Sequence, residues 1–443
     1  MSRIARGFDL DTAISMNRMR DDEDMIGHLA EFGNMGATKR HCRKAIGMRV
    51  PIRRQKKIVV IGAGIGGLAA AVAPRQRGFA IEVYERAGKL EEVGAGLQVG
   101  PNAVKVLRAL GLQDALRRNA FEPINMVSLK WDDASLRHRD PLKAVATERY
   151  GAPYMTAHRA HIHGLLRDAL PEGTVRLEAT CLGADTHNGS AVARFADGRE
   201  VEADAVIGAD GIRSAIRAQL FGADKPRFTE MMCWRAMVPM EHVPTRVGPG
   251  GSIELPHGEY FGWIGPNGHV ICYPIGQGEV LNIFAGHVTD QWVVESWSIQ
   301  SSQGELLAAY VGWNEALLGM FRHVHDVYKW GIHDRDPLPE WTEGRVTLLG
   351  DAAHPTMPTL AQGGNMAIED GYVLARNLDR HQNDIETGLK AYVRERQPRT
   401  ARVTLQSRQQ FANNRKVPPP PFIDRNWIFT FDATQDQEVP QPA

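Results

Sequence analysis

A glycine-rich turn that follows a buried strand is the feature that most constrains the fold of this chain. Residues 57–61 (KIVVI) form a short apolar run, as expected for a buried parallel strand, and residues 62–67 (GAGIGG) follow directly. An alanine-rich helix then leads to a second strand at residues 81–85. The order strand, glycine turn, helix, strand predicts a βαβ unit that binds a dinucleotide.

The three motif glycines have separate predicted roles in this unit. Gly62 turns the chain tightly, Gly64 lets the backbone approach a pyrophosphate, and Gly67 lets the helix and the strand pack closely. Glu85 ends the second strand 18 residues after Gly67, where a carboxylate can accept both hydrogen bonds of an adenosine ribose. We assign Glu85 and the adjacent Arg86 to the cofactor site. The motif alone fits NAD as well as the ADP half of FAD.

Pro74 lies inside the helix that follows the glycine turn. Proline removes a backbone donor and costs about 3 kcal/mol in a helix interior, so we expect the helix to kink or end early there. The affected end is the one away from the phosphates.

The composition argues against several classes of function. Lys plus Arg and Asp plus Glu balance at 52 each, so no bulk charge attracts nucleic acid. The four cysteines are scattered without a CxxC pair, which predicts neither a metal site nor a disulfide framework and fits a reducing cytoplasm. No apolar run reaches the roughly 18 residues of a transmembrane helix, so we expect no integral membrane segment.

Changes in composition and in the pattern of apolar residues along the chain predict its domain organisation. Residues 1–55 have mixed charge and little periodicity, which predicts a disordered extension without a catalytic role. From 226 to 334, short strands, aromatic residues and Gly/Pro turns indicate a mostly antiparallel sheet inserted into an α/β domain. The other predicted parts are the α/β domain at 56–225 and 335–385, a C-terminal helix at 386–416 and a loose tail at 417–443.

Two further motifs place an acidic residue after a strand. The stretch VIGADGIRSAIR contains Asp210 at such a position, and LLGDAAHPTMPTLAQGGNMAIEDG contains Asp351. The second stretch continues through Gly363, Gly364 and Asn365 into a helix. An acid at the end of a strand, followed by a glycine-rich turn into a helix, suits a ribityl chain and a pyrophosphate beside backbone donors.

Together the three motifs resemble those of the class A FAD-dependent monooxygenases, relatives of p-hydroxybenzoate hydroxylase. The resemblance covers about residues 56–416. Within the family the chain is most similar to the salicylate, 3-hydroxybenzoate and 6-hydroxynicotinate hydroxylases, through the segments 94–103 (GAGLQVGPNA) and 268–274 (GHVICYP). The resemblance implies an α/β fold, in which a Rossmann-type FAD-binding domain carries an inserted, mostly antiparallel β-sheet substrate domain and a C-terminal helix.

The implied activity is hydroxylation of a small aromatic acid, salicylate-like or hydroxybenzoate-like, with FAD, NAD(P)H and O2 through a C4a-hydroperoxyflavin. The chain has no second glycine-rich nucleotide fingerprint, so NADH or NADPH is expected as a transient co-substrate. Two other hypotheses stay open. One is a flavin hydroxylase of another ring, such as an N-heterocycle, a polyketide or an antibiotic, and the other is a flavin-binding protein without hydroxylase activity. A monomer or a homodimer in the cytoplasm is expected.

The resemblance also implies a set of cofactor-binding residues. Arg159 matches the family's flavin-contacting arginine, Gln98 stands near the flavin, and Leu182 falls where a backbone contact to the adenine side is expected. Asp210 lies in a motif linked to both FAD and NAD(P)H, and Asp351 would contact the ribityl and pyrophosphate region. The turn expected to place backbone N–H groups near the flavin pyrimidine ring consists of Gly363, Gly364 and Asn365.

His269 and Tyr273 are the candidate catalytic residues. They lie four positions apart on one predicted strand, so both side chains point to the same face. A phenol reacts far better as its phenolate, and a base or proton relay near the ring hydroxyl is therefore useful. In the 3-hydroxybenzoate and 6-hydroxynicotinate hydroxylases a His and a Tyr with this spacing occupy the substrate pocket, the His as base. The alternative is that His269 is an ordinary sheet histidine.

Four residues are candidates for contact with the substrate. Arg235 would hold a carboxylate or brace the flavin, since a guanidinium binds bidentately, or would form a domain-interface salt bridge. Tyr260 and Trp263 would line the ring pocket, or belong to the core of the sheet. Pro358, in the motif around Asp351, is assigned to the same pocket.

The chain departs from the 6-hydroxynicotinate enzymes at two positions. Those enzymes carry a substrate-contacting His eight residues after the aspartate that corresponds to Asp351, where this chain has Thr359. Gln98 stands where they have another His. Both differences count against 6-hydroxynicotinate itself as the substrate.

Overall fold

The computed structural model describes residues 54–90, 96–291, 299–416 and 419–436. All of these except Arg54 belong to one compact unit, Gln55–Ala443. The expectation of a disordered extension concerns residues that lie, apart from Arg54 and Gln55, outside the described ranges.

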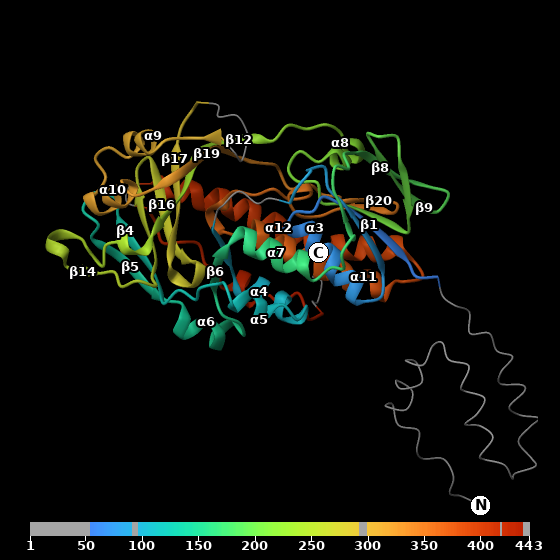
Figure 1. Cartoon of the computed structure of the whole chain (residues 1–443), viewed down its shortest axis with the longest axis horizontal. Coiled ribbons are helices and arrows are strands. Elements are labelled where there is room, and N and C mark those ends of the chain that lie inside the picture. The colour runs from blue at the N-terminus through green and yellow to red at the C-terminus, as the bar shows by residue number, and fades with distance from the viewer. Residues whose placement is uncertain (1–53, 91–95, 292–298, 417–418, 437–443) are drawn as a thin grey trace, which may run out of the picture. The chain divides into compact units, whose positions relative to one another are not determined.

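A mostly parallel six-stranded sheet is the centre of the α/β domain (Figure 1). Its strand order is β20-β21-β11-β1-β2-β7, and β20 runs antiparallel to β21. Its strands are β1 (Lys57–Ile61), β2 (Ala80–Tyr84), β7 (Val175–Arg176), β11 (Ala205–Gly208), β20 (Thr342–Glu343) and β21 (Val346–Leu348). The runs KIVVI in β1 and AVIG in β11 are continuously apolar because a parallel sheet is covered on both faces.

Two helices, α3 (Ile65–Gln76) and α11 (Gly363–Arg380), pack against each other beside this sheet. Small residues allow the contact. A Cβ at Gly371 of α11 would lie 2.6 Å from the carbonyl carbon of Ala69 in α3, so only glycine fits there. Pro74 lies in the last turn of α3, and the helix ends two residues later, as the sequence predicted.

A second, eight-stranded sheet has the order β18-β19-β12-β17-β16-β15-β4-β5. Its strands are β4 (Asn125–Lys130), β5 (Leu136–Pro141), β12 (Arg227–Pro239), β15 (Tyr260–Gly265), β16 (Gly268–Ile275), β17 (Val280–Val288), β18 (Ile299–Gln300) and β19 (His325–Asp334). Neighbours are antiparallel except β4 and β15, which pair in parallel. The sheet thus takes two strands from the segment 56–225, which a local sequence pattern does not reveal.

One face of the eight-stranded sheet is covered by two short helices, α9 (Gln303–Ala309) and α10 (Glu315–Phe321), visible at the upper left of Figure 1. Trp263 of β15, Tyr310 and Phe321 are buried together in the core between the sheet and these helices. The other face of the sheet is therefore the one left for a binding site.

The remaining elements connect the two sheets or flank them. The three-stranded sheet of β8 (Cys181–His187), β9 (Ser190–Phe195) and β10 (Glu200–Ala203) includes the hairpin predicted around residues 197–198. The shorter strands are β3 (Gly96–Val99), which pairs with β6 (Met155–His158), and β13 (Arg246–Val247), which pairs with β14 (Ile253–Glu254). The connecting helices are α4 (Pro101–Ala109), α5 (Gln113–Arg117), α6 (Lys143–Tyr150), α7 (Arg159–Asp168) and α8 (Ala215–Phe221).

The C-terminal part consists of a long helix and a packed segment. α12 (Ile385–Asn414) packs against α11, close to the predicted bounds. We call residues 419–436 the C-terminal strap; it contains α13 (Asn426–Thr430). The prediction of a loose tail is wrong for the strap, since Ile428 and Phe429 are buried. Pro419, Pro420 and Pro421 open the strap, but they do not prevent its apolar residues from packing against the protein.

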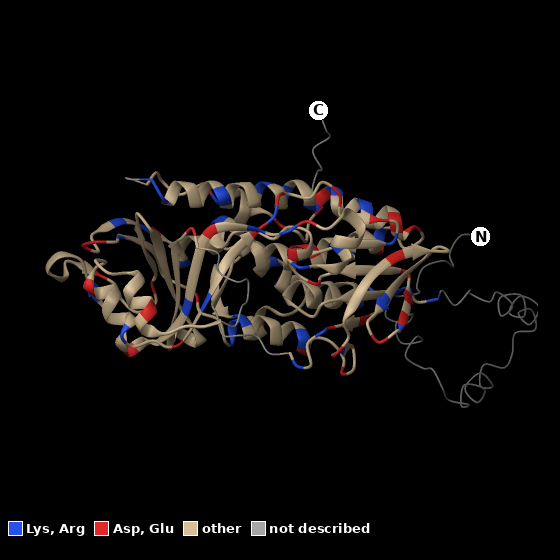
Figure 2. Ribbon diagram, turned by 90° about the horizontal axis from the view of Figure 1, so that it is seen from above, with Lys and Arg blue, Asp and Glu red and all other residues tan. Residues whose placement is uncertain are grey.

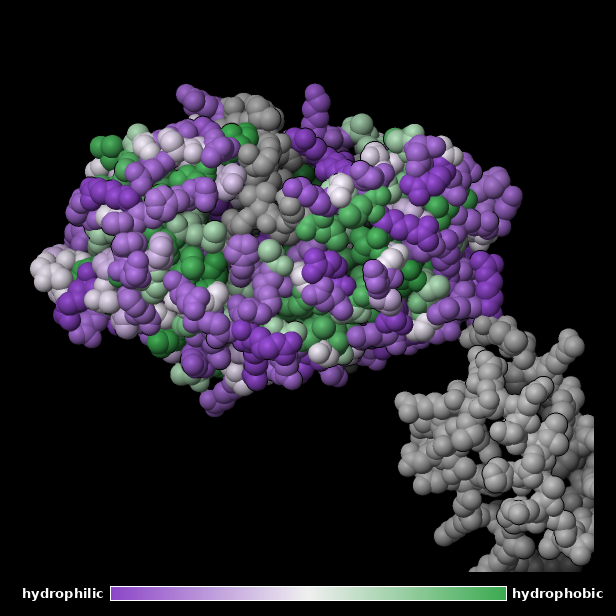
Figure 3. All heavy atoms as spheres, viewed as in Figure 1, coloured by the Kyte–Doolittle hydropathy of each residue, from purple (hydrophilic) through white to green (hydrophobic). Residues whose placement is uncertain are grey.

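Charged residues of both signs are interspersed along the ribbon of the described part (Figure 2). On the face seen in Figure 3, hydrophobic residues lie in separate patches among hydrophilic ones. Within the described ranges, no helix has the length and apolar character that a membrane crossing requires.

Candidate active site

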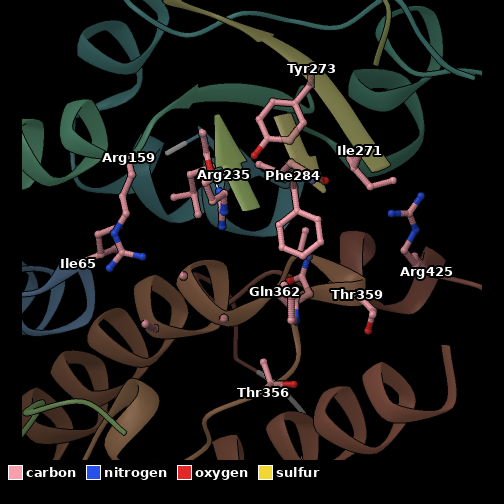
Figure 4. A pocket seen from close by; sticks show the side chains of 18 of the residues that line it. Ile65, Arg159, Arg235, Ile271, Tyr273, Phe284, Thr356, Thr359, Gln362 and Arg425 are labelled. Carbon is pink, nitrogen blue, oxygen red and sulfur yellow. Dashed lines mark hydrogen bonds between the residues drawn. The ribbon is translucent and has the colours of Figure 1, made fainter. Parts of the chain in front are cut away.

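A cavity of about 310 Å³ lies between the open face of the eight-stranded sheet and the starts of α3 and α11 (Figure 4). Most of the predicted site residues meet there. Those that line the cavity are Gly64, Gln98, Arg159, Arg235, Tyr260, His269, Tyr273, Asp351, Pro358, Gly363 and Gly364. Those outside its lining are Gly62, Gly67, Glu85, Arg86, Leu182, Asp210, Trp263 and Asn365.

Two helix starts face the cavity with their backbone donors uncapped. Gly64 is the N-cap of α3 and Gln362 that of α11, and neither cap side chain accepts a hydrogen bond from its helix. The first N–H groups of a helix have no partner within the helix, and the helix dipole adds positive potential. Gly363 and Gly364 at the start of α11 present this backbone without side chains. The cavity therefore has two places suited to anionic groups of a cofactor.

The geometry of the glycine turn fits a dinucleotide pyrophosphate. A Cβ on Gly67 would lie 1.9 Å from the carbonyl oxygen of Gly62, so the third glycine is required for packing. A Cβ on Gly64 would meet no protein atom within 4 Å and would point into open space at the cavity wall. Gly64 thus leaves room for a ligand rather than for protein. Oδ1 of Asp210 is buried and has no hydrogen-bond partner among the described residues, which leaves an acceptor for a cofactor donor.

Glu85, Arg86 and Leu182 lie outside the cavity, as expected for contacts to the adenosine end of a long cofactor. Both carboxylate oxygens of Glu85 accept backbone hydrogen bonds, from Ala63 at 2.8 Å and from Ala87 at 2.9 Å. Glu85 is therefore fixed beside the glycine turn. The side chains of Arg86 and Leu182 are exposed, and Leu182 has 61% of its surface accessible.

Asp351 and Arg159 are two charged residues that line the cavity. Asp351 follows β21 and is open to the cavity, and Arg159 is the first residue of α7. The surrounding protein atoms raise the pKa of Asp351, while His354 and Arg159 act in the opposite direction. In Figure 4 Arg159 lies beside Ile65 of α3, at the glycine-turn side of the cavity.

Gln98 and Asn365 connect β3 to the start of α11. The Asn365 side chain donates to the Gln98 carbonyl at 2.9 Å and accepts from the Gly100 N–H at 2.9 Å. The Gln98 side chain instead accepts a hydrogen bond from the Tyr154 hydroxyl, with 2.5 Å between Oε1 and the phenol oxygen. The role of Asn365 in this structure is thus to hold the turn, beside the glycine backbone that faces the cavity.

His269 and Tyr273 both face the cavity from β16, as their spacing predicted. Both are buried, with 5% and 3% of their surfaces accessible. Burial lowers the pKa of His269 to about 4 and raises that of Tyr273 to about 12. His269 is therefore neutral and Tyr273 protonated across the neutral pH range, which gives the cavity one acceptor and one donor without net charge.

Aromatic rings surround this acceptor and donor. Tyr260 stacks on Tyr273 with ring centroids 5.9 Å apart and planes 6° apart. His269 stacks on Phe284 of β17 at 5.6 Å. Such flat, apolar walls suit a planar aromatic ligand.

Trp263 does not line the cavity. Side chains alternate along a strand, so Tyr260, Gly262 and Ile264 of β15 face the cavity while Trp263 points to the opposite face. Tyr260 therefore lines the cavity, while Trp263 belongs to the core of the sheet, the alternative given for both; the odd separation of the two residues could have shown that they do not share a pocket. Pro358 does line the cavity, next to Thr359.

Arg235 of β12 braces the cavity wall. Its Nη1 donates to the carbonyl oxygen of Gly96 in β3 at 3.0 Å, and its guanidinium lies 5.3 Å from the ring centroids of both Phe284 and Trp330. Nε is buried without a hydrogen-bond partner within the described part of the chain. Arg235 also lines a smaller neighbouring cavity of about 100 Å³, on the side of Trp330. No salt bridge across a domain interface is formed by Arg235 among the described residues.

A buried charge network lies behind the start of α11. Arg396 of α12 forms ion pairs of 2.7 Å with Glu369 and with Asp370, and His354 lies 2.6 Å from Asp370. Arg399 also pairs with Glu369. Although burial opposes it, Arg399 and Arg396 lower the pKa of Glu369, and His354 and Arg396 lower that of Asp370. His354 thus belongs to the support of α11 and does not line the cavity.

Several cavity residues were absent from the sequence prediction. Ile271 lies between His269 and Tyr273 at the same strand period, and Phe284 is its cross-strand partner, so both could have been inferred from the pattern. Phe422 and Arg425 reach the cavity from the C-terminal strap. No sequence signal indicates them, since the strap returns to the cavity only in the folded protein.

Known proteins resemble this chain along most of its length. A family model described as "FAD binding domain" matches residues 55–407. The 3-amino-4-hydroxybenzoate 2-monooxygenase PtmB3 of Streptomyces platensis is 38% identical over 390 residues, which cover 85% of this chain and 96% of the relative. The 6-hydroxynicotinate 3-monooxygenase of Pseudomonas fluorescens is 34% identical over 382 residues, covering 85% and 95%. The crystal structure of Klebsiella pneumoniae HpxO with FAD and uric acid has a TM-score of 0.73 at 26% identity and covers 81% of this chain and 89% of that one.

Proposed function

This chain belongs to the class A FAD-dependent aromatic monooxygenases, and on that premise we propose that it hydroxylates a small aromatic acid of the hydroxybenzoate or salicylate type. The observation that carries the proposal is one cavity in which a neutral histidine and a protonated tyrosine, His269 and Tyr273, face two uncapped helix starts. The name of the 3-amino-4-hydroxybenzoate relative supports the substrate class.

The residues present fit FAD. The N–H groups at the start of α3 would hold the pyrophosphate, Glu85 the adenosine ribose, and Asp351 the ribityl chain. The start of α11 at Gly363 and Gly364 would face the pyrimidine edge of the flavin ring. When bound and reduced by NAD(P)H, FAD would activate O2, from which one oxygen atom enters the ring and the other leaves as water.

His269 and Tyr273 would prepare the ring for attack. Burial lowers the pKa of His269, so its imidazole is unprotonated at neutral pH and would accept a hydrogen bond from the ring hydroxyl, in the position of the base. Tyr273, which stays protonated, would donate a hydrogen bond and orient the ring. Tyr260, stacked on Tyr273, would close the apolar wall and keep water from the reacting carbon.

Arg235 is assigned to positioning rather than to the substrate carboxylate. Its hydrogen bond to Gly96 and its place between Phe284 and Trp330 support this choice. Pro358 and Thr359 would form the wall beside the flavin. Thr359 donates its hydroxyl to the Ser407 carbonyl at 2.6 Å, which supports a structural part for it.

The proposal includes the co-substrates and the setting of the enzyme. NADH or NADPH would bind transiently to reduce FAD, and O2 would enter afterwards. The scattered cysteines support a cytoplasmic location, and the protein would act as a monomer or a homodimer.

The proposed function is tested by measuring how much hydroxylated product and how much hydrogen peroxide the enzyme forms. Purified protein with its FAD is supplied with NADH or NADPH and a panel of salicylate, the hydroxybenzoate isomers and 3-amino-4-hydroxybenzoate, and oxygen uptake is followed. We expect at least one acid to accelerate NAD(P)H oxidation and to be hydroxylated. Oxidation that no acid accelerates, or that neutral and N-heterocyclic rings accelerate more, would contradict the proposed substrate class.

Two histidine variants, compared with each other, test the catalytic assignment. His269→Asn should lower the hydroxylation rate by about 100-fold or more, or divert oxygen to peroxide, because the proton acceptor is lost. FAD content should be unchanged. His287→Asn is the matched control, since His287 lies on β17 of the same sheet but does not line the cavity. Unchanged rate and coupling in His269→Asn would remove His269 from the reaction.

A further inference from the structure

The C-terminal strap is held firmly against the α/β domain. Lys105 of α4 donates hydrogen bonds to three consecutive carbonyl groups of the strap, at Phe429, Thr430 and Phe431, with distances of 3.0 to 3.1 Å. Arg399 of α12 donates to the Ile428 carbonyl at 3.0 Å. These bonds satisfy the carbonyl groups at the end of α13, and they fix the position of the residues that precede it.

Arg425, just before α13, is aimed into the cavity from this strap. It lines the cavity together with Phe422, and Figure 4 shows its side chain near Ile271, across the cavity from Arg159. The phosphate-binding side is the one near Arg159 and α3. Arg425 therefore lies away from that side, near Ile271, which stands between His269 and Tyr273 along β16.

The guanidinium of Arg425 has little to bind in the protein itself. Its Nη2 lies 3.3 Å from the sulfur of Met126, a weak acceptor, and its charge lies 5.5 Å from the Phe429 ring centroid. Across the described ranges, no carboxylate is within ion-pair distance of it. A half-buried arginine with only a thioether and a ring beside it is suited to an anionic ligand.

The charge of Arg425 acts on two tyrosines at or near the cavity, Tyr154 and Tyr260. It lowers the pKa values of Tyr154 and Tyr260, against the larger effect of burial, which raises both. Arg235 also lines the cavity, and its charge acts on Tyr273, but its Nη1 is bonded to Gly96 and only its Nε is without a partner among the described residues. Arg425, which has no oxygen acceptor of its own in the described part of the chain, has the more available guanidinium for a negative group on a bound ring.

We propose that Arg425 binds the carboxylate of the aromatic substrate, so that the C-terminal strap determines the preference for acids. This rests on the proposed function and deepens it. The guanidinium can present two parallel N–H donors to the carboxylate, which would fix the ring with its hydroxyl toward His269.

Binding of an acid and of its amide to the same enzyme tests the assignment. The dissociation constants of salicylate and salicylamide, and of 3-hydroxybenzoate and 3-hydroxybenzamide, are measured from the change in flavin absorbance. In Arg425→Met the affinity for the acid should fall by about 10- to 100-fold. The affinity for the amide should change by less than about 3-fold, because its hydrogen bonds carry no charge. Arg425→Lys should lie between the wild type and Arg425→Met.

Arg402→Met is the matched control. Arg402 is exposed on α12 and stacks on Trp427 of the strap at 3.9 Å, but it does not line the cavity. It should bind the acids as the wild type does.

The possible outcomes separate this inference from the proposed function. If the wild type hydroxylates an acid but Arg425→Met binds acid and amide with equal losses, or binds the acid unchanged, Arg425 does not bind the carboxylate. Loss of FAD from both Arg425 variants would assign Arg425 to flavin retention and would also overturn the proposal. If the wild type hydroxylates only uncharged rings, the proposed substrate class itself fails, whatever the Arg425 variants do.

Discussion

Arg235 donates a hydrogen bond to the carbonyl oxygen of Gly96, and Asn282 accepts one from the Gly96 N–H, at 3.0 and 2.6 Å. Side chains from two strands of the eight-stranded sheet, β12 and β17, thus hold both backbone polar groups of one glycine. Gly96 begins β3, which lines the cavity. The wall of the site and the sheet that carries His269 are therefore coupled through this residue.

Gly96→Ala should disturb the site through contact with Tyr273. A Cβ at Gly96 would lie 2.6 Å from Cε2 of Tyr273 and 2.6 Å from Cγ of Asn282, both buried side chains that have no room to move. We expect a loss of about 1–3 kcal/mol in unfolding free energy and a fall in hydroxylation. Gly164→Ala is the control, because a Cβ at that position of α7 meets no atom within 4 Å and alanine favours the helix. Equal activity of the two variants would contradict the proposed coupling.

Two glycines of the first motif should respond differently to alanine. In Gly67→Ala the new Cβ would lie 1.9 Å from the Gly62 carbonyl oxygen, so both the thermal stability of the FAD-free protein and its FAD affinity should fall. In Gly64→Ala the Cβ meets only open space, so stability without FAD should be retained while FAD binding weakens. Thermal unfolding with and without added FAD measures both effects. Unimpaired FAD binding by Gly64→Ala would show that the cofactor does not approach this backbone.

Removal of Arg396 should be strongly destabilising. It would leave Glu369 and Asp370, which are fully buried, short of their shared positive partner. We expect Arg396→Met to lower the unfolding free energy by about 3–5 kcal/mol. Arg394→Met on the same helix, where the side chain is exposed, should change it by less than about 0.5 kcal/mol. Denaturant unfolding of both variants is the measurement, and similar midpoints would contradict a structural role for the network.

His269 should make stability depend on pH. Its pKa falls from 6.5 in the unfolded chain to about 4 in the folded protein, so the unfolded state binds the proton more readily. The contribution is therefore fully present above pH 6.5 and is lost as the pH falls toward 4. Between pH 7 and pH 5 the wild type should lose about 2 kcal/mol relative to His269→Asn. Thermal midpoints of the two proteins at both pH values provide the test, and a constant difference between them would show that His269 is not buried in its neutral form.

Much of the fold could be predicted because its signals are local. The apolar runs at β1, β11 and β21 and the glycine turn give strands and cofactor loops directly from neighbouring residues. The pairing of β4 with β15 could not be predicted, because it joins segments more than 100 residues apart in parallel. The alternation of side chains along a strand also predicted that His269 and Tyr273 share a face. The same alternation, counted from Tyr260, places Trp263 on the opposite face and so excludes it from the cavity.

The cavity wall formed by the strap depends on long-range packing that no local pattern encodes. Phe422 and Arg425 follow a run of prolines, which in sequence indicates only that a helix ends. The strap is held by Lys105, which is 324 residues from the Phe429 carbonyl that it binds, and by Arg399 of α12, which binds the Ile428 carbonyl. A composition that is typical of a loose segment is therefore compatible with a fixed one when distant side chains satisfy its backbone.

The order of the chain has a consequence for how this site is made in the cell. Phe422 and Arg425 follow every other residue of the cavity lining, so they are the last of that lining to leave the ribosome during synthesis. The wall formed by the strap is therefore the part of the cavity that synthesis completes last. On the proposed role of Arg425, selection of the substrate depends on the part of the lining that is made after all the rest.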